Sequence, residues 1–514
     1  MDVDNPIVVI AGAGSGKTHQ MIIEIIKIIP ILKKYPEKFC VVITYTNSAT
    51  EEIKDRLSKI IDIPHNLHIS TTHSFLTKFI IEPYAHLFGY LPIDKNYIDK
   101  IILPFKVNNH FIAKALCIKK ANELSSEKGL IIYDKILEAS SLIINNEEVN
   151  RQVSNRLAYI FVDEYQDMRL YQHSIFQSIL SQRRTNFYCI GDPMQSIFGF
   201  AYLHSQLKNE PKPKKFNETP ILNLQKDERF DKRQININNR SSKKIVDLIN
   251  NYNHVIGYSQ TLPEGKGCNK IPVNFIWGKD KNEILDKYEQ IIKKYNVLKE
   301  NNKMFSLLIA ERWNLFDDID KITSINNEYG TTKTLFNECS RIVLGALGIN
   351  KTSFLEILPF NDKHEKYLRY RQFCFSILKD IRNPQIKVDS KYIIDRFNNS
   401  FGIKFKDQDN HNIDISKSII KLKIISKEEQ NDRFCSSIHT SKGLEATSVL
   451  VIANTNKELL KWLDFDKVIH DSDDDYRLGY VAFSRARELL CITCLQKPNE
   501  ELIKLLTKLE IEIN

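Results

Sequence analysis

Long apolar runs are missing from this 514-residue sequence. No stretch approaches the roughly 20 apolar residues that a helix needs to cross a bilayer, so we expect neither a membrane span nor a membrane partner. The sequence starts with Met-Asp-Val-Asp-Asn-Pro, without the basic and apolar segments of a secretion signal. These two absences predict a cytoplasmic protein.

A disulfide framework is also missing. Nine cysteines are scattered between Cys40 and Cys494, and their odd number argues for reduced thiols. The CxxC pattern from Cys491 to Cys494 has no second pair to complete a zinc site, and it lies in the strand-like run LLCITCL. We interpret it as core packing rather than as a metal or redox site.

Composition excludes few soluble classes. Hydrophobic residues make up 42% and charged residues 27% of the chain, which is typical of globular proteins. A chain of this length should divide into roughly two to four domains. Lys and Arg number 73 against 64 Asp and Glu, and the resulting charge of +9 permits a nucleic-acid partner without requiring one.

A buried strand, a glycine-rich turn and a helix follow one another near the start of the sequence. Residues 8–10 are β-branched and apolar, and residues 11–18 read AGAGSGKT. Such a turn presents backbone N–H groups and a helix N-terminus to phosphates, while Lys17 reaches the terminal phosphates and Thr18 ligates Mg²⁺. The nucleotide-binding residues that this P-loop predicts are Ala11, Gly12, Ala13, Gly14, Ser15, Gly16, Lys17, Thr18 and His19.

An acidic strand end supplies the other half of an ATPase site. Residues 159–167 read YIFVDEYQD, so Asp163 can hold Mg²⁺ and Glu164 can orient and deprotonate the attacking water. Two acids at a strand end are unremarkable alone, but here a P-loop accompanies them. Gln195, after a further strand at 186–190, is suited to sensing the γ-phosphate. The expected cofactors are ATP and Mg²⁺.

Eight sequence blocks in order resemble the UvrD/Rep/PcrA-type superfamily 1A helicases. The blocks are AGAGSGKT, TYTNSATEEIKDR, STTHSF, FVDEYQD, GDPMQSIFGF, NNRS at 238–241, SIHTSKGLE at 437–445 and YVAFSRAR at 480–487. The resemblance implies an α/β protein with two RecA-like P-loop domains and mainly helical insertions. The boundaries we expect are 1–80 plus 149–206 for the first RecA-like domain, 81–148 for its helical insertion, 207–314 plus 431–514 for the second, and 315–430 for a reduced second insertion.

Matching positions carry the family's site residues onto this sequence. The resemblance implies that Arg240 and Arg485 reach the γ-phosphate from the second domain and that Glu445 contacts the ribose. Aromatic faces can stack on any base, as a DNA motor requires, although each aromatic taken singly is more often a core residue. The DNA-binding residues implied are Tyr45, Thr46, Asn47, His73, Phe75, Phe198, Phe200 and His439.

Two departures from the family pattern concern the nucleobase. No Gln-containing segment precedes the P-loop, and Asn239 stands where the family often has an aromatic residue before the Arg of the NxRS block. We therefore expect weak discrimination between bases.

Three functions remain open at this level. The resemblance implies a 3′→5′ DNA helicase or single-strand translocase with DNA-stimulated ATPase activity, acting on single-stranded or tailed DNA. The compact size also resembles the helicase subunits of Gabija-type anti-phage systems, which implies a DNA-sensing ATPase that regulates a partner nuclease. A P-loop ATPase without nucleic acid is the third alternative, and it predicts no stimulation by single-stranded DNA.

Overall fold

The computed structural model contains two compact units. Unit 1 comprises Met1–Asp318, Ser324–Asn326 and Arg433–Asn514, and unit 2 comprises Ile319–Thr323 and Asn327–Asp432. The residues that the structure describes are 3–89, 96–98, 115–116, 119–120, 123, 130–197, 210–264, 271–298, 304–316, 319, 322–325, 335–349, 351–360, 362–383, 386, 388–403, 433–469 and 474–514.

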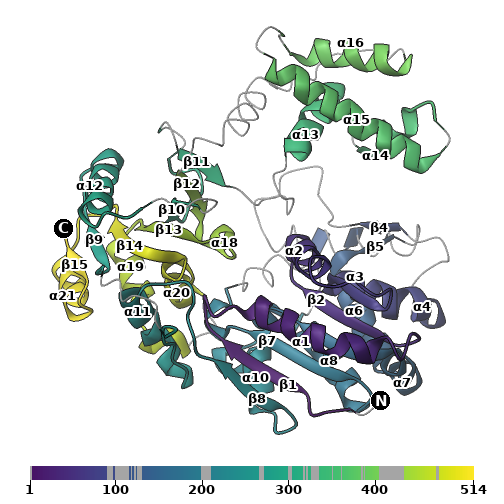
Figure 1. Ribbon diagram of the computed structural model, residues 1–514, viewed down its shortest axis with the longest axis horizontal. Coiled ribbons are helices and arrows are strands. Elements are labelled where there is room, and N and C mark those ends of the chain that lie inside the picture. The colour runs from purple at the N-terminus through teal and green to yellow at the C-terminus, as the bar shows by residue number, and fades with distance from the viewer. Residues whose placement is uncertain are drawn as a thin grey trace. The chain divides into compact units, whose positions relative to one another are not determined.

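A parallel six-stranded sheet forms the first lobe of unit 1 (Figure 1). Its strands are β1 (Ile7–Ala11), β2 (Phe39–Thr44), β3 (Leu67–Thr71), β6 (Leu157–Val162), β7 (Asn186–Gly191) and β8 (Asp231–Ile235), in the order β3-β2-β6-β7-β1-β8. β1 pairs with β7 so that Val8 lies opposite Cys189 and Ile10 opposite Gly191. Parallel pairing brings the carboxyl ends of β1, β6 and β7 to one edge, where the predicted site residues follow.

Apolar residues cover both faces of this sheet, as its β-branched strands require. On one face, Met21 and Ile25 of α1 (Lys17–Leu32) and Ile53 of α2 (Asn47–Ser58) pack on the strands. The other face joins a larger core that also contains residues of the second lobe, such as Val481. Helical elements of the first lobe are α3 (Thr72–Leu76), η1 (Thr77–Ile81), α4 (Glu82–Tyr84), η2 (Ala85–Phe88), α6 (Tyr133–Ile144), α7 (Glu147–Arg156), η3 (Tyr165–Asp167), α8 (Leu170–Ser181), η4 (Pro193–Gln195), η5 (Phe216–Glu218) and α10 (Pro220–Lys226).

The first lobe extends further along the chain than expected. β8 pairs with β1, with Ile7 opposite Asp231, although the sequence analysis assigns everything after residue 206 to the second domain. Ile221 of α10 also lies in the core shared with the first sheet. The first lobe therefore continues past residue 206 through α10 and β8, and β8 escapes a sequence-based prediction because a charged edge strand such as Asp-Lys-Arg-Gln-Ile gives no apolar pattern.

The described part of 81–148 is not a separate helical body. Ile136 and Leu137 of α6 are buried in the same core as Phe176 of α8. A small parallel sheet of β4 (Asn96–Ile98) and β5 (Leu130–Ile132) also occurs in this range, for which a helical insertion is expected. Three-residue strands are too short to give a periodic signal.

The second lobe of unit 1 is a second parallel sheet. Its order is β11-β12-β10-β13-β14-β9-β15, formed by β9 (Asn274–Ile276), β10 (Ser306–Ala310), β11 (Ile322–Ile325), β12 (Arg433–Ser437), β13 (Ala446–Ala453), β14 (Ala486–Cys494) and β15 (Glu512–Ile513). Its helices are α11 (Lys243–Asn253), η6 (His254–Ile256), α12 (Lys281–Lys294), α18 (Ile438–Ser441), α19 (Asn456–Trp462), η7 (Asp466–Ile469), α20 (Asp475–Phe483) and α21 (Glu500–Lys508). Cys491 and Cys494 are buried free thiols of β14, as core packing predicts.

Apart from the two β11 residues that belong to it, Ile322 and Thr323, the described part of unit 2 is mainly helical. It contains α13 (Leu335–Leu347), α14 (Lys351–Ile357), α15 (Lys363–Arg382) and α16 (Ser390–Phe401). Phe354, Phe373 and Phe397 lie at the centre of its own core. Asp362 and Asp389 cap α15 and α16 by accepting backbone N–H groups.

Within the described ranges, no helix combines the length and the apolarity that membrane crossing requires. Those ranges also hold no group of three or more His, Cys, Asp or Glu residues suited to a metal ion.

Gly479 allows α20 to approach the rest of the second lobe. A Cβ at this position would lie 2.4 Å from the Tyr252 hydroxyl and 2.7 Å from the Trp462 carbonyl oxygen. We expect Gly479→Ala to destabilise the protein by about 1–3 kcal/mol, because backbone and a buried ring must shift. A lowered thermal unfolding midpoint checks this, and an unchanged midpoint would contradict it.

Candidate nucleotide-binding and catalytic site

The P-loop ends in a helix N-terminus that no side chain caps. Gly16 is the N-cap of α1 and adopts a left-handed conformation with φ 81° and ψ 33°, and it makes no side-chain cap hydrogen bond. Gly14 is also left-handed, with φ 74°. The Ser15 hydroxyl donates to the Gly12 carbonyl oxygen at 2.7 Å and so closes the turn. The first N–H groups of α1, including those of Lys17 and Thr18, therefore point at a position suited to phosphate.

Thr18 and Asp163 meet at this helix start. The Thr18 hydroxyl donates to Asp163 Oδ2 at 2.9 Å, and the Glu164 N–H donates to Asp163 Oδ1 at 2.9 Å. Burial, followed by the charge of Glu164, raises the pKa of Asp163 to about 7. A buried carboxylate in this situation gains from a cation, and the paired oxygens are the ligand type that Mg²⁺ prefers. The two residues fit the predicted metal site.

Glu164 is held in an unusual backbone conformation beside Lys17. It has φ 51° and ψ 47°, a left-handed conformation that costs about 1–2 kcal/mol for a residue with a Cβ. Its Oε2 lies 4.0 Å from Lys17 Nζ and accepts from Gln166 Nε2 at 2.6 Å. Burial opposes its charge, but Lys17 and Lys442 outweigh burial and lower the pKa of Glu164. The carboxylate stays in the ionised form that a general base needs.

Gln195 lies between the lobes. Its Nε2 donates to Asp192 Oδ2 at 2.7 Å within the first lobe, and its Oε1 accepts from Arg485 Nη2 of the second lobe at 3.3 Å. Asp192 also accepts from the Tyr480 hydroxyl at 2.9 Å. The predicted sensor is thus connected to both lobes.

Arg485 is a buried cation whose hydrogen-bond acceptors are neutral. Only 1% of the residue is exposed, and its guanidinium donates to the Val481 carbonyl at 2.8 Å and to the Ser484 hydroxyl at 2.9 Å. Among the residues that the structure describes, all its hydrogen-bond acceptors are uncharged. Burial, followed by the nearby Arg240, lowers the pKa of Arg485 to about 9. Burying such a charge is costly unless an anion binds beside it.

Arg240 and Glu445 form an ion pair next to the P-loop. Arg240 Nε donates to Glu445 Oε2 at 2.5 Å, and Arg240 Nη1 donates to the Ser484 carbonyl at 3.0 Å. A Cβ on Gly14 would lie 2.7 Å from Arg240 Cβ, so Arg240 packs directly on the loop. Arg487 Nη2 also donates to Glu445. Glu445, predicted to contact ribose, is therefore held by two arginines.

Further residues, which are not among the predicted site residues, also link the lobes. Lys442 Nζ donates to both Asp167 oxygens, at 2.7 and 2.6 Å, and to the Gln195 carbonyl at 2.9 Å. Arg477 Nε donates to the Ser196 carbonyl at 2.7 Å. Lys442 and Asp167 lie inside the blocks SKGLE and DEYQD, and this is the signal that could have found them.

The predicted DNA-binding residues fall into three groups. Tyr45, Thr46 and Asn47 are exposed after β2, although Thr46 rather than Asn47 caps α2 by accepting the Ala49 N–H at 3.1 Å. His439 is exposed on α18, and His73 is partly exposed on α3. Phe198 and Phe200 lie outside the described residues.

Phe75 requires a correction. The residue is 0% exposed, and its ring centroid lies 5.4 Å from that of Phe79 and 6.1 Å from that of Phe176. No base can stack on a ring enclosed in this way. Phe75 is therefore a core residue, as most single aromatic residues are.

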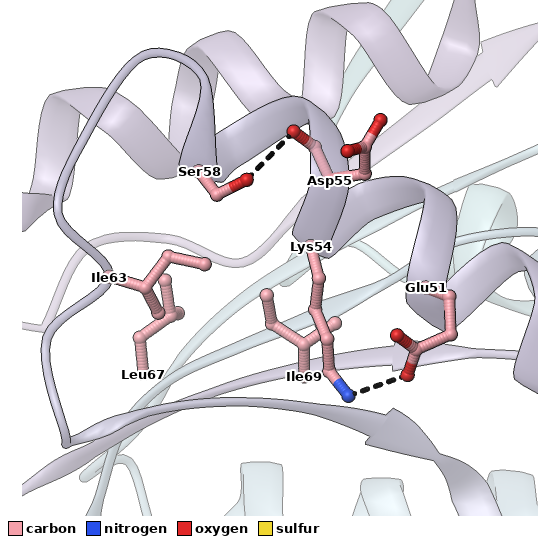
Figure 2. Close-up of a pocket in the computed structure, with 7 residues that line it drawn as sticks. All are labelled: Glu51, Lys54, Asp55, Ser58, Ile63, Leu67 and Ile69. Carbon is pink, nitrogen blue, oxygen red and sulfur yellow. Dashed lines mark hydrogen bonds and ion pairs between the residues drawn. The ribbon is translucent and has the colours of Figure 1, made fainter. Parts of the chain in front are cut away.

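A depression elsewhere on the first lobe does not involve these residues. Its volume is about 340 Å³. Figure 2 shows the residues that line it, with apolar side chains on one side and charged side chains of α2 on the other. The charged side is internally paired, since Lys54 donates to Glu51 at 2.9 Å and Ser58 donates to the Asp55 carbonyl at 3.0 Å. Ile63, Leu67 and Ile69 form the apolar side.

Breaking the Lys442–Asp167 pair should destabilise the protein in a pH-dependent manner. The two side chains are 11% and 2% exposed, and burial, opposed by Lys442, raises the pKa of Asp167 to about 7. We expect Lys442→Met to cost up to about 3–5 kcal/mol, because Asp167 loses its partner. Protonation relieves this carboxyl, so the loss should be smaller near pH 5.5 than near pH 8.5 and should grow as the pH rises.

Thermal unfolding midpoints at the two pH values check this prediction. The exposed pair Lys54–Glu51, with side chains 43% and 73% exposed, offers the matched control Lys54→Met. That variant should change stability by only about 0–1 kcal/mol at either pH. A pH-independent loss in Lys442→Met would contradict the prediction.

Comparisons with known proteins agree with this geometry. Residues 3–201 match the family described as AAA domain. The chain is 26% identical over 243 residues to a probable DNA helicase II homologue of Rickettsia conorii, which covers 39% of this chain and 37% of that protein. It is 25% identical over 236 residues to the ATP-dependent DNA helicase Rep of Buchnera aphidicola subsp. Baizongia pistaciae, covering 38% and 35%.

A longer match exists at lower identity. The chain is 22% identical over 619 aligned residues to a probable DNA helicase II homologue of Mycoplasma capricolum, covering 96% of this chain and 82% of that protein. The matches to the Rickettsia and Buchnera proteins span little more than a third of those relatives. Two parallel α/β sheets, a match to an AAA domain over residues 3–201 and the relatives above make the chain similar to the DNA helicase II, Rep and PcrA proteins.

Proposed function

We propose that the chain is a Mg²⁺-dependent ATPase whose hydrolysis cycle drives movement along single-stranded DNA. The observation that carries this proposal is the environment of Arg485, a cation with 1% exposure and a pKa lowered to about 9. It adjoins Gln195 of the opposite lobe, while Arg240 packs on the P-loop at Gly14. A γ-phosphate held by the P-loop supplies the negative charge that this environment lacks.

Each group of the site has a separate task in hydrolysis. Lys17 and the N–H groups that open α1 bind the phosphates, and Thr18 and Asp163 would hold the metal. The metal, when bound, neutralises charge on the phosphoryl oxygens. Glu164 takes the proton of the attacking water, since its carboxylate stays ionised beside Lys17. Arg485 and Arg240 stabilise the charge on the transferred group, because their guanidinium groups are fixed in the second lobe.

The contacts around Gln195 support coupling between hydrolysis and DNA movement. Arg485 binds its side chain, Lys442 binds its carbonyl, and Arg477 binds the carbonyl of Ser196. Loss of the γ-phosphate changes the partners of Arg485, so the second lobe shifts relative to this segment. The exposed residues Tyr45 and His439 lie on different lobes and offer two surfaces for a strand.

The names of the relatives support DNA as the track. The similar proteins of Rickettsia and Buchnera are named as DNA helicases. From the family resemblance we infer 3′→5′ polarity and single-stranded or tailed DNA as the substrate. Regulation of a partner nuclease in anti-phage defence is the alternative use of the same ATPase. In that role, DNA ends rather than movement along a strand should activate hydrolysis.

The substitution Glu164→Gln tests the proposed base. We expect ATP turnover to fall about 10²–10⁴-fold, because the amide accepts no proton, while binding of Mg²⁺ADP is retained. Steady-state phosphate release and equilibrium binding measure the two effects. Glu24→Gln on α1, where Glu24 pairs with Lys27 at 2.8 Å, is the matched control and should leave turnover unchanged. Wild-type turnover in Glu164→Gln would remove this residue as the base.

Circular and linear single-stranded DNA distinguish the proposed motor from its alternatives. A translocating ATPase should be stimulated by both forms, because hydrolysis continues as long as the chain moves along the strand. An ATPase that senses DNA ends should respond to the linear form alone. Phosphate release with each DNA measures this, and no stimulation by either form would contradict the proposed coupling to DNA.

A further inference from the structure

The first turn of the P-loop is bonded to side chains from a later part of the chain. The Tyr258 hydroxyl accepts the Gly12 N–H at 2.8 Å, and the Tyr480 hydroxyl accepts the Ala13 N–H at 3.1 Å. The Ala13 carbonyl accepts from Asn238 Nδ2 and from Gln260 Nε2, both at 3.0 Å. Two consecutive N–H groups and one carbonyl of the loop are therefore satisfied by side chains of the protein itself.

These side chains are themselves fixed. Tyr258 and Gln260 are each 2% exposed, and Asn238 and Tyr480 are fully buried. Tyr258 also donates to the Ile235 carbonyl at 2.5 Å. The backbone of Gln260 is bound on both sides by Asn250 of α11, through bonds of 2.9 Å from its N–H and to its carbonyl. The contacts to the loop are thus made by a rigid support.

Gly12 fits this support closely. A Cβ at Gly12 would lie 2.7 Å from Gln260 Cδ, so the amide of Gln260 packs flat against the loop. The φ of Gly12 is not positive, and the glycine is therefore required here for space rather than for backbone conformation.

We propose that Tyr258 and Gln260 are positioning residues that hold the first turn of the P-loop in its nucleotide-binding shape. Neither residue belongs to a recognised motif. Their side chains hydrogen-bond the backbone of Gly12 and Ala13. The loop residues at the start of α1 therefore remain available to bind phosphate. The inference rests on the proposed function, since it concerns the same nucleotide site. Its physical basis is preorganisation, because a loop already ordered loses less entropy when the ligand binds.

This role predicts that substitutions change KM for ATP more than kcat. The bonds that Tyr258 and Gln260 make to the loop go to the backbone of Gly12 and Ala13, and not to Arg240, Arg485 or Glu164. Loosening them should weaken ADP and ATP to a similar extent, and the KM for ATP should rise while kcat changes little. A residue with only a structural role would lower the unfolding midpoint without changing KM.

The substitution Tyr258→Phe removes one hydroxyl and leaves the Gly12 N–H without its acceptor. We expect the Kd for Mg²⁺ADP and the KM for ATP to rise about 5- to 100-fold, with kcat within about 2-fold of wild type. Titration of the full chain with a fluorescent ADP analogue and steady-state hydrolysis measure these quantities. Tyr288→Phe is the matched control, since this buried tyrosine bonds Ser306 at 3.2 Å within the second lobe. It should lower the unfolding midpoint comparably and leave Kd unchanged.

A double-mutant cycle tests the contact between Gly12 and Gln260 independently. Gly12→Ala should weaken ADP binding because its methyl group displaces the Gln260 amide, and Gln260→Ala should weaken it through loss of the bond to Ala13. In the Gln260→Ala background, Gly12→Ala should have almost no further effect, since the clash is gone. Additive losses would overturn the proposed contact. Wild-type binding in Tyr258→Phe and Gln260→Ala would overturn the inference, whereas absence of nucleotide binding in the wild-type chain would instead overturn the proposed function.

Discussion

A positive charge without a carboxylate partner lies at the junction of the two lobes. Arg485 is almost fully buried, and its hydrogen-bond acceptors among the described residues are neutral oxygens. Burial of a cation costs free energy unless an anion compensates it. A negatively charged ligand at this junction would relieve that cost. Under the proposed function, this constraint is the reason why residues of both lobes surround the P-loop.

The P-loop divides into a fixed half and a receptive half. Gly12 and Ala13 are bonded to Tyr258, Tyr480 and Gln260, so this half is tied to residues from a later part of the chain. The half that opens α1 carries no side-chain cap. Under the proposed function, hydrolysis changes the partners of Arg485 and Arg240 at the receptive half.

Local sequence motifs were sufficient to predict the site residues of the first lobe. The P-loop and the acidic strand end each occupy a few consecutive residues, so Thr18 and Asp163 were found from their own neighbourhoods, and the structure brings them to 2.9 Å. Arg240 and Arg485 came from resemblance, since a lone arginine carries no signal. Tyr258 and Gln260 had none at all, because their role depends on a fold that brings residues more than two hundred positions apart into contact.

The sequence predicted the fold class correctly but missed the short strands and a charged edge strand. Buried parallel strands such as β1 and β13 are apolar runs and were recognisable. β8 is a charged edge strand, and β4 and β5 have three residues each, so none has a usable pattern. Phe75 shows the converse limit, since its motif suggested DNA contact while its ring packs on Phe79 and Phe176.

The central claim is that one nucleotide is shared by the two lobes. A structure of the chain with Mg²⁺ and a non-hydrolysable ATP analogue tests it most directly. The account predicts that the guanidinium groups of Arg485 and Arg240 lie within hydrogen-bond distance, about 3 Å, of the γ-phosphate bound at the start of α1. A γ-phosphate contacted by the first lobe alone, with Arg485 still bonded to Gln195 and Arg240 still paired with Glu445, would contradict it.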